Sequence, residues 1–196
     1  MHNLIKKYIV THLGGSKSEV PLEALDDAAV VGDIVLKSDS HAVKPIFFPG
    51  GDIGRLAVAG TVNDIAVMGA EPIALACGFV LEEGLQITDF ERILESMEQT
   101  CKEAGVYIIT GDTKVVEKGN LGGCVINTSG IGKRNKALEK NIAEVKKHRS
   151  FNTRWILDSN LREGDKIIIS GTLGDHGLAV LSAQEGYNLE VKSSLM

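Results

Sequence analysis

The sequence predicts an α/β (α+β) fold, because segments with helical spacing and apolar segments suited to buried strands follow one another along the chain. The helical segments are a nearly all-apolar stretch, Ile53–Gly69, and an amphipathic stretch, Phe90–Ala104. The strand-like segments are the apolar runs Ile73–Leu81, Val106–Thr110 and Cys124–Ser129. At 196 residues the chain can bury one good core and begin a second domain.

The chain opens with a short helical pattern over residues 2–10, which Gly14 and Gly15 end. Two apolar runs, Leu25–Val31 and Ile34–Ser40, then flank a Gly-Asp turn, and this arrangement predicts a β-hairpin. Binding sites are commonly built where strands end. Three acidic residues fall at the ends of these strands: Asp26, Asp27 and Asp39.

The apolar helix is the element around which the chain is organised. Asp52 is placed as its N-cap, and Gly69 with Pro72 supplies its stop. Asp64 falls on the buried stripe of this helix, and Asn63 lies beside that stripe. Because a buried carboxylate is costly without a partner, Asp64 has two alternative interpretations. It pairs either with an N–H group or arginine inside the core, or with a bound metal ion.

The second helix has clear start and stop signals. Thr88 and Glu91 have the spacing of a capping box, and Gly105 closes the helix. Cys101 lies on its core face, so we interpret this cysteine as a packing residue rather than a reactive one.

A polar segment, Gly111-Asp112-Thr113-Lys114, follows the strand predicted to end at Thr110. A glycine permits close approach of a ligand, a carboxylate can hold a metal, and a lysine can pair with phosphate. The segment is therefore either part of a binding site or an ordinary polar turn.

A segment rich in Lys and Glu, 133–149, predicts a solvated amphipathic helix or linker rather than a nucleic-acid patch. Phe151 and Trp155 are expected to anchor the stretch after it. We assign residues 1–132 to an N-terminal domain, 133–163 to a linker or insertion, and 164–196 to the incomplete start of a second domain.

The second domain is expected to begin with a strand, Lys166–Ser170, then a glycine-rich loop and a helix from Leu178. The loop resembles a phosphate-binding opening, but it has neither the G-x-G-x-x-G nor the P-loop spacing. We interpret His176 in this loop as a hydrogen-bonding residue rather than a catalytic one.

Composition excludes several classes of protein. The net charge of -5 does not suggest nucleic-acid binding, and no apolar run approaches transmembrane length. The N-terminus lacks the residue order of a signal peptide. Three well-separated cysteines, with no C-x-x-C pair, indicate neither a zinc site nor a disulfide framework: Cys77, Cys101 and Cys124. We expect a protein of the reducing cytoplasm that binds neither nucleic acid nor membrane.

Acidic residues recur at the ends of the predicted buried elements: Asp26, Asp27, Asp39, Asp64 and Asp112. Each has a possible structural role, but together, with glycines beside them, they predict a carboxylate cage for divalent cations. Magnesium binds through a few carboxylates together with substrate phosphates. A nucleoside triphosphate would supply those phosphates, and the absence of a Walker A motif implies a different design for ATP binding.

A series of motifs, taken in order, resembles the HypE family of hydrogenase maturation proteins: L-D-D-A-A-V, S-D-S, F-F-P-G-G-D-I-G, G-T-V-N-D-I-A-V-M-G-A-E-P, C-G-F-V-L-E-E-G, T-G-D-T-K-V-V and S-G-T-L-G-D-H-G. The family shares a superfamily with aminoimidazole ribonucleotide synthetase, selenophosphate synthetase and thiamine-monophosphate kinase. The D-D-A-A and N-D-I-A-V-M-G-A pieces are common to that superfamily. F-F-P-G-G-D-I-G, T-G-D-T-K-V-V and S-G-T-L-G-D-H-G are much more specific to HypE.

The resemblance implies a PurM-like N-terminal domain with a mixed sheet and packed helices, which pairs in a homodimer and holds ATP and Mg²⁺. It also implies partners, namely a HypF-type carbamoyltransferase and a HypC–HypD complex. By motif position, the metal and phosphates would be held by Asp27, Asp39, Asp64 and Asp112. Asn63 and Gly111 would contribute to ATP binding, and Lys114 would be the charged group near the reacting centre.

The implied reaction is the ATP-dependent dehydration of a carbamoylated C-terminal cysteine to a thiocyanate, the source of the cyanide ligands of [NiFe]-hydrogenase. Phosphoryl transfer to the amide oxygen makes that oxygen a leaving group, and a base removes the nitrogen protons. The last cysteine here is Cys124, so we expect this chain to be incomplete and unable to finish the dehydration. The alternatives are a kinase of the thiamine-monophosphate type and a non-catalytic dimerisation or docking module.

Overall fold

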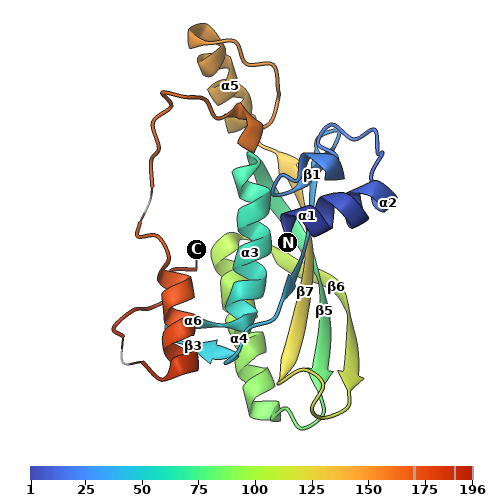
Figure 1. Cartoon of the computed structure of the whole chain (residues 1–196), viewed down its shortest axis with the longest axis vertical. Helices are drawn as coiled ribbons and strands as arrows, with labels where there is room; N and C mark the ends of the chain where they lie inside the picture. The colour runs from blue at the N-terminus through green and yellow to red at the C-terminus, as the bar shows by residue number, and fades with distance from the viewer. Residues whose placement is uncertain (170, 188, 196) are drawn as a thin grey trace.

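The computed structural model describes residues 1–169, 171–187 and 189–195. It has the predicted α/β architecture, with a five-stranded sheet that helices α3 and α4 cover on one face (Figure 1). The strand order is β1-β2-β7-β5-β6, and only the β5–β6 pair is parallel, so the sheet is mixed. Its strands are β1 (Ala29–Val31), β2 (Ile34–His41), β5 (Ala70–Glu82), β6 (Tyr107–Val116) and β7 (Cys124–Arg134). A small ribbon pairs β3 (Phe47–Phe48) with β4 (Gly51–Asp52).

Helix α3 (Ile53–Val67) begins and ends as the sequence predicts. The Asp52 carboxylate accepts hydrogen bonds from the backbone N–H groups of Gly54 and Arg55, at 2.7 and 3.0 Å, and so caps the helix. Gly69 follows the helix with a φ of 83°, a left-handed conformation that glycine adopts without strain. These contacts confirm the predicted start and end of α3. The helix packs along the sheet against β2, β7 and β5 (Figure 1).

Helix α4 (Ile87–Ala104) packs beside α3 and ends at Gly105, as predicted, but its start differs. The N-cap residue is Gln86, and its side chain makes no capping hydrogen bond. The predicted capping box of Thr88 and Glu91 is therefore wrong. Because the helix begins before Thr88, that residue already lies in the first turn and cannot act as the cap.

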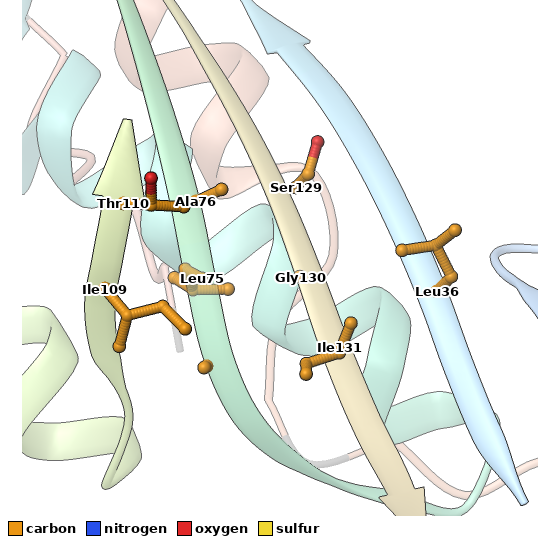
Figure 2. Close-up of a pocket in the computed structure, with 9 residues that line it drawn as sticks. Leu36, Leu75, Ala76, Ile109, Thr110, Ser129, Gly130 and Ile131 are labelled. Carbon is orange, nitrogen blue, oxygen red and sulfur yellow. The ribbon is translucent and has the colours of Figure 1, made fainter. Parts of the chain in front are cut away.

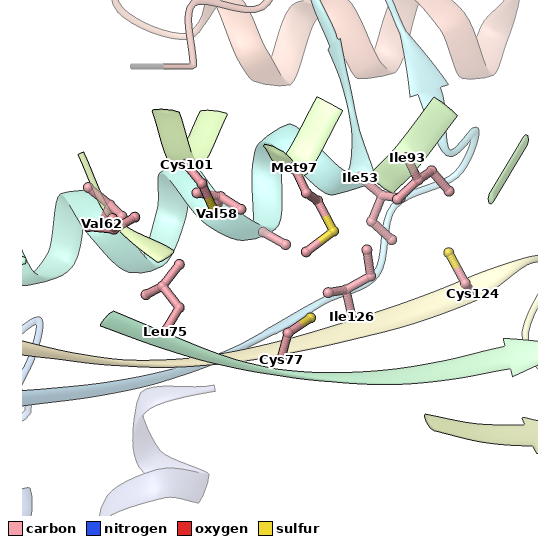
Figure 3. Close-up of a cluster of buried hydrophobic side chains, with 12 residues drawn as sticks. Ile53, Val58, Val62, Leu75, Cys77, Ile93, Met97, Cys101, Cys124 and Ile126 are labelled. Carbon is pink, nitrogen blue, oxygen red and sulfur yellow. The ribbon is translucent and has the colours of Figure 1, made fainter. Parts of the chain in front are cut away.

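The main core fills the space between these two helices and the sheet (Figure 3). Its largest fully buried side chains are Ile53, Leu75, Ile93, Met97 and Ile126. All three cysteines are buried and free, and Cys101 is 7% exposed, so its interpretation as a packing residue is confirmed. Burial raises the pKa of the Cys77 and Cys124 thiols to about 11.

The N-terminal helix consists of α1 (His2–Leu4), the π-helical turns η1 (Ile5–Val10) and α2 (Thr11–Leu13). It ends at Gly14, and the predicted hairpin forms between β1 and β2. Strand β1 starts at Ala29 rather than Leu25, because Leu22–Ala24 form a 3₁₀ turn (η2) and Leu25 takes a left-handed φ of 52°.

Helix α5 (Lys136–His148) confirms the predicted amphipathic helix, and one of its faces is buried. Leu138 and Ile142 pack with the buried Trp155 and with Ile65 and Met68 near the end of α3. A short 3₁₀ turn, η3 (Asp158–Asn160), follows. Trp155 is 1% exposed, so it anchors its stretch as expected.

Helix α6 (Asp175–Glu185) starts three residues before the predicted Leu178. The predicted strand Lys166–Ser170 is wrong for Lys166–Ile169, and Ser170 lies outside the described residues. Among the residues that the structure describes, no strand pairs with this segment, and a lone strand has no hydrogen-bonding partner. His176 Nδ1 lies 3.1 Å from Ser193 Oγ, in agreement with a hydrogen-bonding role.

Strand β6 differs most from the sequence prediction. It was expected to be buried and to end at Thr110, but it runs to Val116 on the exposed edge of the sheet. The alternative of a polar turn for the segment Gly111–Lys114 is therefore wrong, since these residues lie within the strand. The alternative that they belong to a binding site remains a prediction. Apolar side chains of three strands are exposed on the sheet face opposite α3 and α4 (Figure 2): Leu36, Ile109 and Ile131.

The loop between β6 and β7 is held by the Glu82 carboxylate. This carboxylate accepts hydrogen bonds from the backbone N–H groups of Leu121, Gly122 and Gly123, at 3.3, 2.9 and 2.8 Å, and also from that of Gly119. These bonds, that of Leu121 first, lower the pKa of Glu82. Within the described part of the chain, no helix is both long enough and apolar enough to cross a membrane.

Candidate nucleotide and metal site

Two of the predicted acidic residues, Asp39 and Asp64, meet at a lysine between the sheet and α3, and a third, Asp27, lies nearby. Lys37 Nζ lies 2.5 Å from Asp64 Oδ2 and 3.2 Å from Asp39 Oδ1, so it links strand β2 to helix α3. Side chains alternate along a strand, so Lys37 and Asp39 share the face of β2 that α3 covers. The partner of Asp64 is thus a lysine, not the arginine or backbone N–H group considered for it.

Asp27 belongs to the same group of charges. It lies exposed just before β1, and it lines a cavity of about 520 Å³ together with Lys37 and with His2 and Ile5 of the N-terminal helix. Leu36 and Ser38 also line this cavity, so it extends to the face of β2 opposite Asp39. Burial raises the pKa of Asp27, and the negative charge of Asp64 raises it further. A cavity of this size lies within the range typical of small-molecule sites.

Lys37 is less exposed than most lysines. Its side chain is 18% exposed, and those of Asp39 and Asp64 are 24% and 29% exposed. Burial lowers the pKa of Lys37, but hydrogen bonds to Asp64 and Asp39 outweigh this effect and raise it overall. The Lys37 side chain is therefore a positively charged ammonium group within this site.

His41 lies on the same face of β2, two residues beyond Asp39. Its ring packs against α3 at Gly60, where an added Cβ would lie 2.9 Å from His41 Cε1. His41 Nε2 is 3.2 Å from Thr128 Oγ1, which donates to the backbone oxygen of Ala57 at 3.0 Å. Burial lowers the pKa of His41, although the charges of Asp39 and Asp64 oppose this shift.

The structure does not bring Asp112 to this group within one chain. Asp112 pairs in register with Gly78, Gly78 with Asn127, and Asn127 with Ser40. Ser40 alternates with Asp39 and bonds Asn127 through Oγ at 2.6 Å, so this row of side chains faces away from α3. Asp112 thus lies on the opposite face of the sheet from Asp39.

The remaining predicted site residues are exposed. Gly111 and Lys114 lie with Asp112 on the edge strand β6, and Lys114 shares the face of Asp112. Asn63 is exposed on α3, next to Asp64 in the sequence. Residue type and motif position predict these site residues from the sequence. The pairing register of the strands determines which of their side chains lie close together.

Two residues of the site were missed from sequence, Lys37 and His41. The alternation of side chains along β2 could have identified them, because it places both residues on the same face as Asp39. Asp158, in η3, was also missed. One of its oxygens lies within 4.8 Å of Asp26 and Asp27 oxygens, at an exposed position.

Carboxylate oxygens are the ligands that hard divalent cations prefer, so the chemistry of Asp27, Asp39 and Asp64 suits a magnesium ion. Among the described residues, however, the three carboxylates whose oxygens lie within 4.8 Å of one another are those of Asp26, Asp27 and Asp158. Residues 25–133 match the family model of the AIR synthase related protein, N-terminal domain. The carbamoyl dehydratase HypE of Azotobacter vinelandii is 46% identical over 159 residues, which are 81% of this chain and 42% of that protein.

This chain belongs to the HypE family. A crystal structure of a HypE–HypF complex aligns with a TM-score of 0.80 and 42% identity, over 96% of this chain and 56% of that one. A crystal structure of HypE in complex with ATP aligns with a TM-score of 0.72 and 42% identity, over 99% of this chain and 53% of that one. The chain spans about half the length of the HypE relatives that it matches.

Proposed function

We propose that this chain is the ATP-binding part of a carbamoyl dehydratase that acts in hydrogenase maturation. The observation that carries the proposal is the pair of carboxylates, Asp39 and Asp64, bridged by Lys37. Lys37 also lines an adjacent cavity together with Asp27. The relationship to HypE, for which a complex with ATP has been solved, identifies the type of ligand that such a group would serve. The ion expected with the nucleotide is Mg²⁺.

The carboxylates of the site would bind the metal ion. Asp39 and Asp64, on facing elements, would hold the divalent cation, and Asp27 would complete its ligands from the cavity side. ATP, when bound, supplies the phosphoryl group that makes the carbamoyl oxygen a leaving group. On the resemblance alone, we retain Asn63, Gly111 and Asp112 as ATP-binding residues and Lys114 as the charged group near the reacting centre.

The homodimer that the family resemblance predicts would use the open face of the sheet. Leu36, Ile109 and Ile131 are 49, 69 and 38% exposed there, on three different strands (Figure 2). Contiguous exposed apolar surface of this kind commonly marks a protein interface. In such a dimer, Asp112 and Lys114 would lie at the interface, which would account for their distance from Asp39.

We also propose the partners and compartment of the HypE family for this chain. The solved HypE–HypF complex supports a HypF-type carbamoyltransferase as one partner. A HypC–HypD complex and a cytoplasmic location rest on the family resemblance. We retain the division into a domain at 1–132, a linker or insertion at 133–163 and the start of a second domain at 164–196.

Titration calorimetry with ATP and MgCl₂ tests the proposal. We expect saturable binding by the wild-type chain and a loss of at least about tenfold in affinity for Asp64→Asn, which corresponds to about 1.4 kcal/mol. The matched control is Asp89→Asn, which removes the same charge from a partly exposed side chain at the start of α4. Absence of binding by the wild-type chain would favour the alternative of a dimerisation or docking module.

A further inference from the structure

The lysine at the centre of the site occupies the position between two prospective metal ligands. Lys37 Nζ makes its two ionic contacts with Asp64 on α3 and Asp39 on β2, at 2.5 and 3.2 Å. No other lysine or arginine pairs with either carboxylate in the described part of the chain. The ammonium therefore bridges the two elements as a cation would.

The surroundings make this bridge effective. All three side chains are less than a third exposed, so solvent and salt screen their attraction less than they screen that of a surface pair. A magnesium or manganese ion needs carboxylate oxygens at about 2.0–2.2 Å, much closer than an ammonium approaches them. With Lys37 in place, such an ion would share both oxygens with a positive charge in direct contact with them, and the like charges would repel.

We propose that Lys37 is the resident cation of this site and keeps divalent metal ions off Asp39 and Asp64 until a nucleotide arrives. This inference rests on the proposed function for the identity of the nucleotide. A triphosphate supplies negative charge that can draw the ammonium away, and it adds oxygen ligands for the metal. Lys37 is thus a positioning residue that makes metal binding conditional on nucleotide binding.

The test measures binding of Mn²⁺ alone, by electron paramagnetic resonance of the free ion, with no nucleotide present. We expect weak binding by the wild-type chain and at least about tenfold tighter binding by Lys37→Met. Lys37→Arg keeps the charge and should bind as weakly as wild type. The matched control, Lys102→Met, removes the same charge from an exposed ion pair with Glu98 and should also resemble wild type.

The double variant Lys37→Met with Asp64→Asn should lose the gain in Mn²⁺ affinity, which would locate the new binding at this site. Unchanged Mn²⁺ affinity in Lys37→Met would overturn the proposal, as would tight Mn²⁺ binding by the wild-type chain that Asp64→Asn abolishes. If Lys37→Met does not fold without metal, its melting temperature should rise with MnCl₂ and that of Lys102→Met should not. Because no nucleotide is used, these outcomes are independent of whether the chain binds ATP.

Discussion

Strand β7 packs closely against α3 at Gly130, and replacement of this glycine by alanine tests the packing that positions the site. An added Cβ at Gly130 would lie 2.7 Å from Ile65 Cδ1, 2.7 Å from Leu75 Cδ2 and 2.9 Å from Thr61 Cγ2. These three side chains are at most 1% exposed, so none can swing into solvent to relieve the contact. Either the neighbours leave their preferred rotamers or α3 moves away from the sheet.

The expected loss of stability is the difference between two opposing effects. Insertion of a methyl group into a well-packed core typically costs about 1–3 kcal/mol. Replacement of glycine by alanine within a strand returns about 0.5–1 kcal/mol. With three crowded neighbours the packing cost should dominate, so we expect Gly130→Ala to lower the free energy of unfolding by about 1–2 kcal/mol. For a chain of this size that corresponds to a melting temperature lower by roughly 2–8 °C.

Urea denaturation followed by fluorescence measures this change directly. Trp155 is the single tryptophan, and it is buried in the same cluster as Ile65, so its emission reports on the affected region. The control is Gly177→Ala in α6, where an added Cβ meets nothing within 4 Å and stability should be unchanged or slightly higher. If Gly130→Ala were as stable as wild type, the close packing of β7 on α3 would be refuted.

Three further predictions concern the open face, the β6–β7 loop and the thiols. Ile131→Lys should convert a dimer to a monomer in light scattering without lowering the melting temperature; a dimer that persists would contradict the proposed interface. The pKa of Glu82 is lowered by backbone N–H groups, that of Leu121 first, so the loop should be ordered above the unfolded-state pKa and loosen as pH falls through the lowered one. Amide exchange against Glu82→Gln measures this effect, and equal protection in both proteins at neutral pH would contradict it. Burial raises the pKa of Cys77 and Cys124 to about 11, so both thiols should resist a thiol reagent at pH 8 until urea unfolds the chain; rapid labelling of the folded protein would contradict their burial.

Local signals in the sequence predicted the helices and the hairpin well. The cap at Asp52 and the stops at Gly69 and Gly105 each act within a few residues of the helix end, so they can be read without knowledge of the fold. The predicted capping box failed because Thr88 has the right spacing but α4 begins before it. Spacing alone does not show which residue of a polar stretch remains outside the helix.

Whether a strand is buried was harder to predict from the sequence than where the strand lies. The run from Val106 to Thr110 is apolar, and this suggested burial beneath the helices, but β6 is exposed at the sheet edge. An apolar strand can be covered by its own chain or by another, and composition does not distinguish these cases. The segment Lys166–Ile169 is also apolar, yet it forms no strand, because strand formation depends on a hydrogen-bonding neighbour.

The candidate site was predicted in its residue types and only partly in its geometry. Asp39 on β2 and Asp64 on α3 meet at Lys37, and Asp27, just before β1, is near enough for the charge of Asp64 to raise its pKa. The face of Asp112 depends on the register between β5 and β6, which shifts at a bulge between Leu75 and Ala76. A shift of one residue exchanges the two faces of a strand, and sequence patterns do not fix such a shift.

The most direct test of the nucleotide-site proposal is a crystal structure of this chain with a non-hydrolysable ATP analogue and Mn²⁺, in which anomalous scattering locates the metal. We predict an anomalous peak bonded to carboxylate oxygens of Asp39 and Asp64, at about 2.1–2.2 Å, with Lys37 Nζ moved away from both. A peak at Asp26 and Asp158 alone, or at Asp112 remote from α3, would contradict the account of this site.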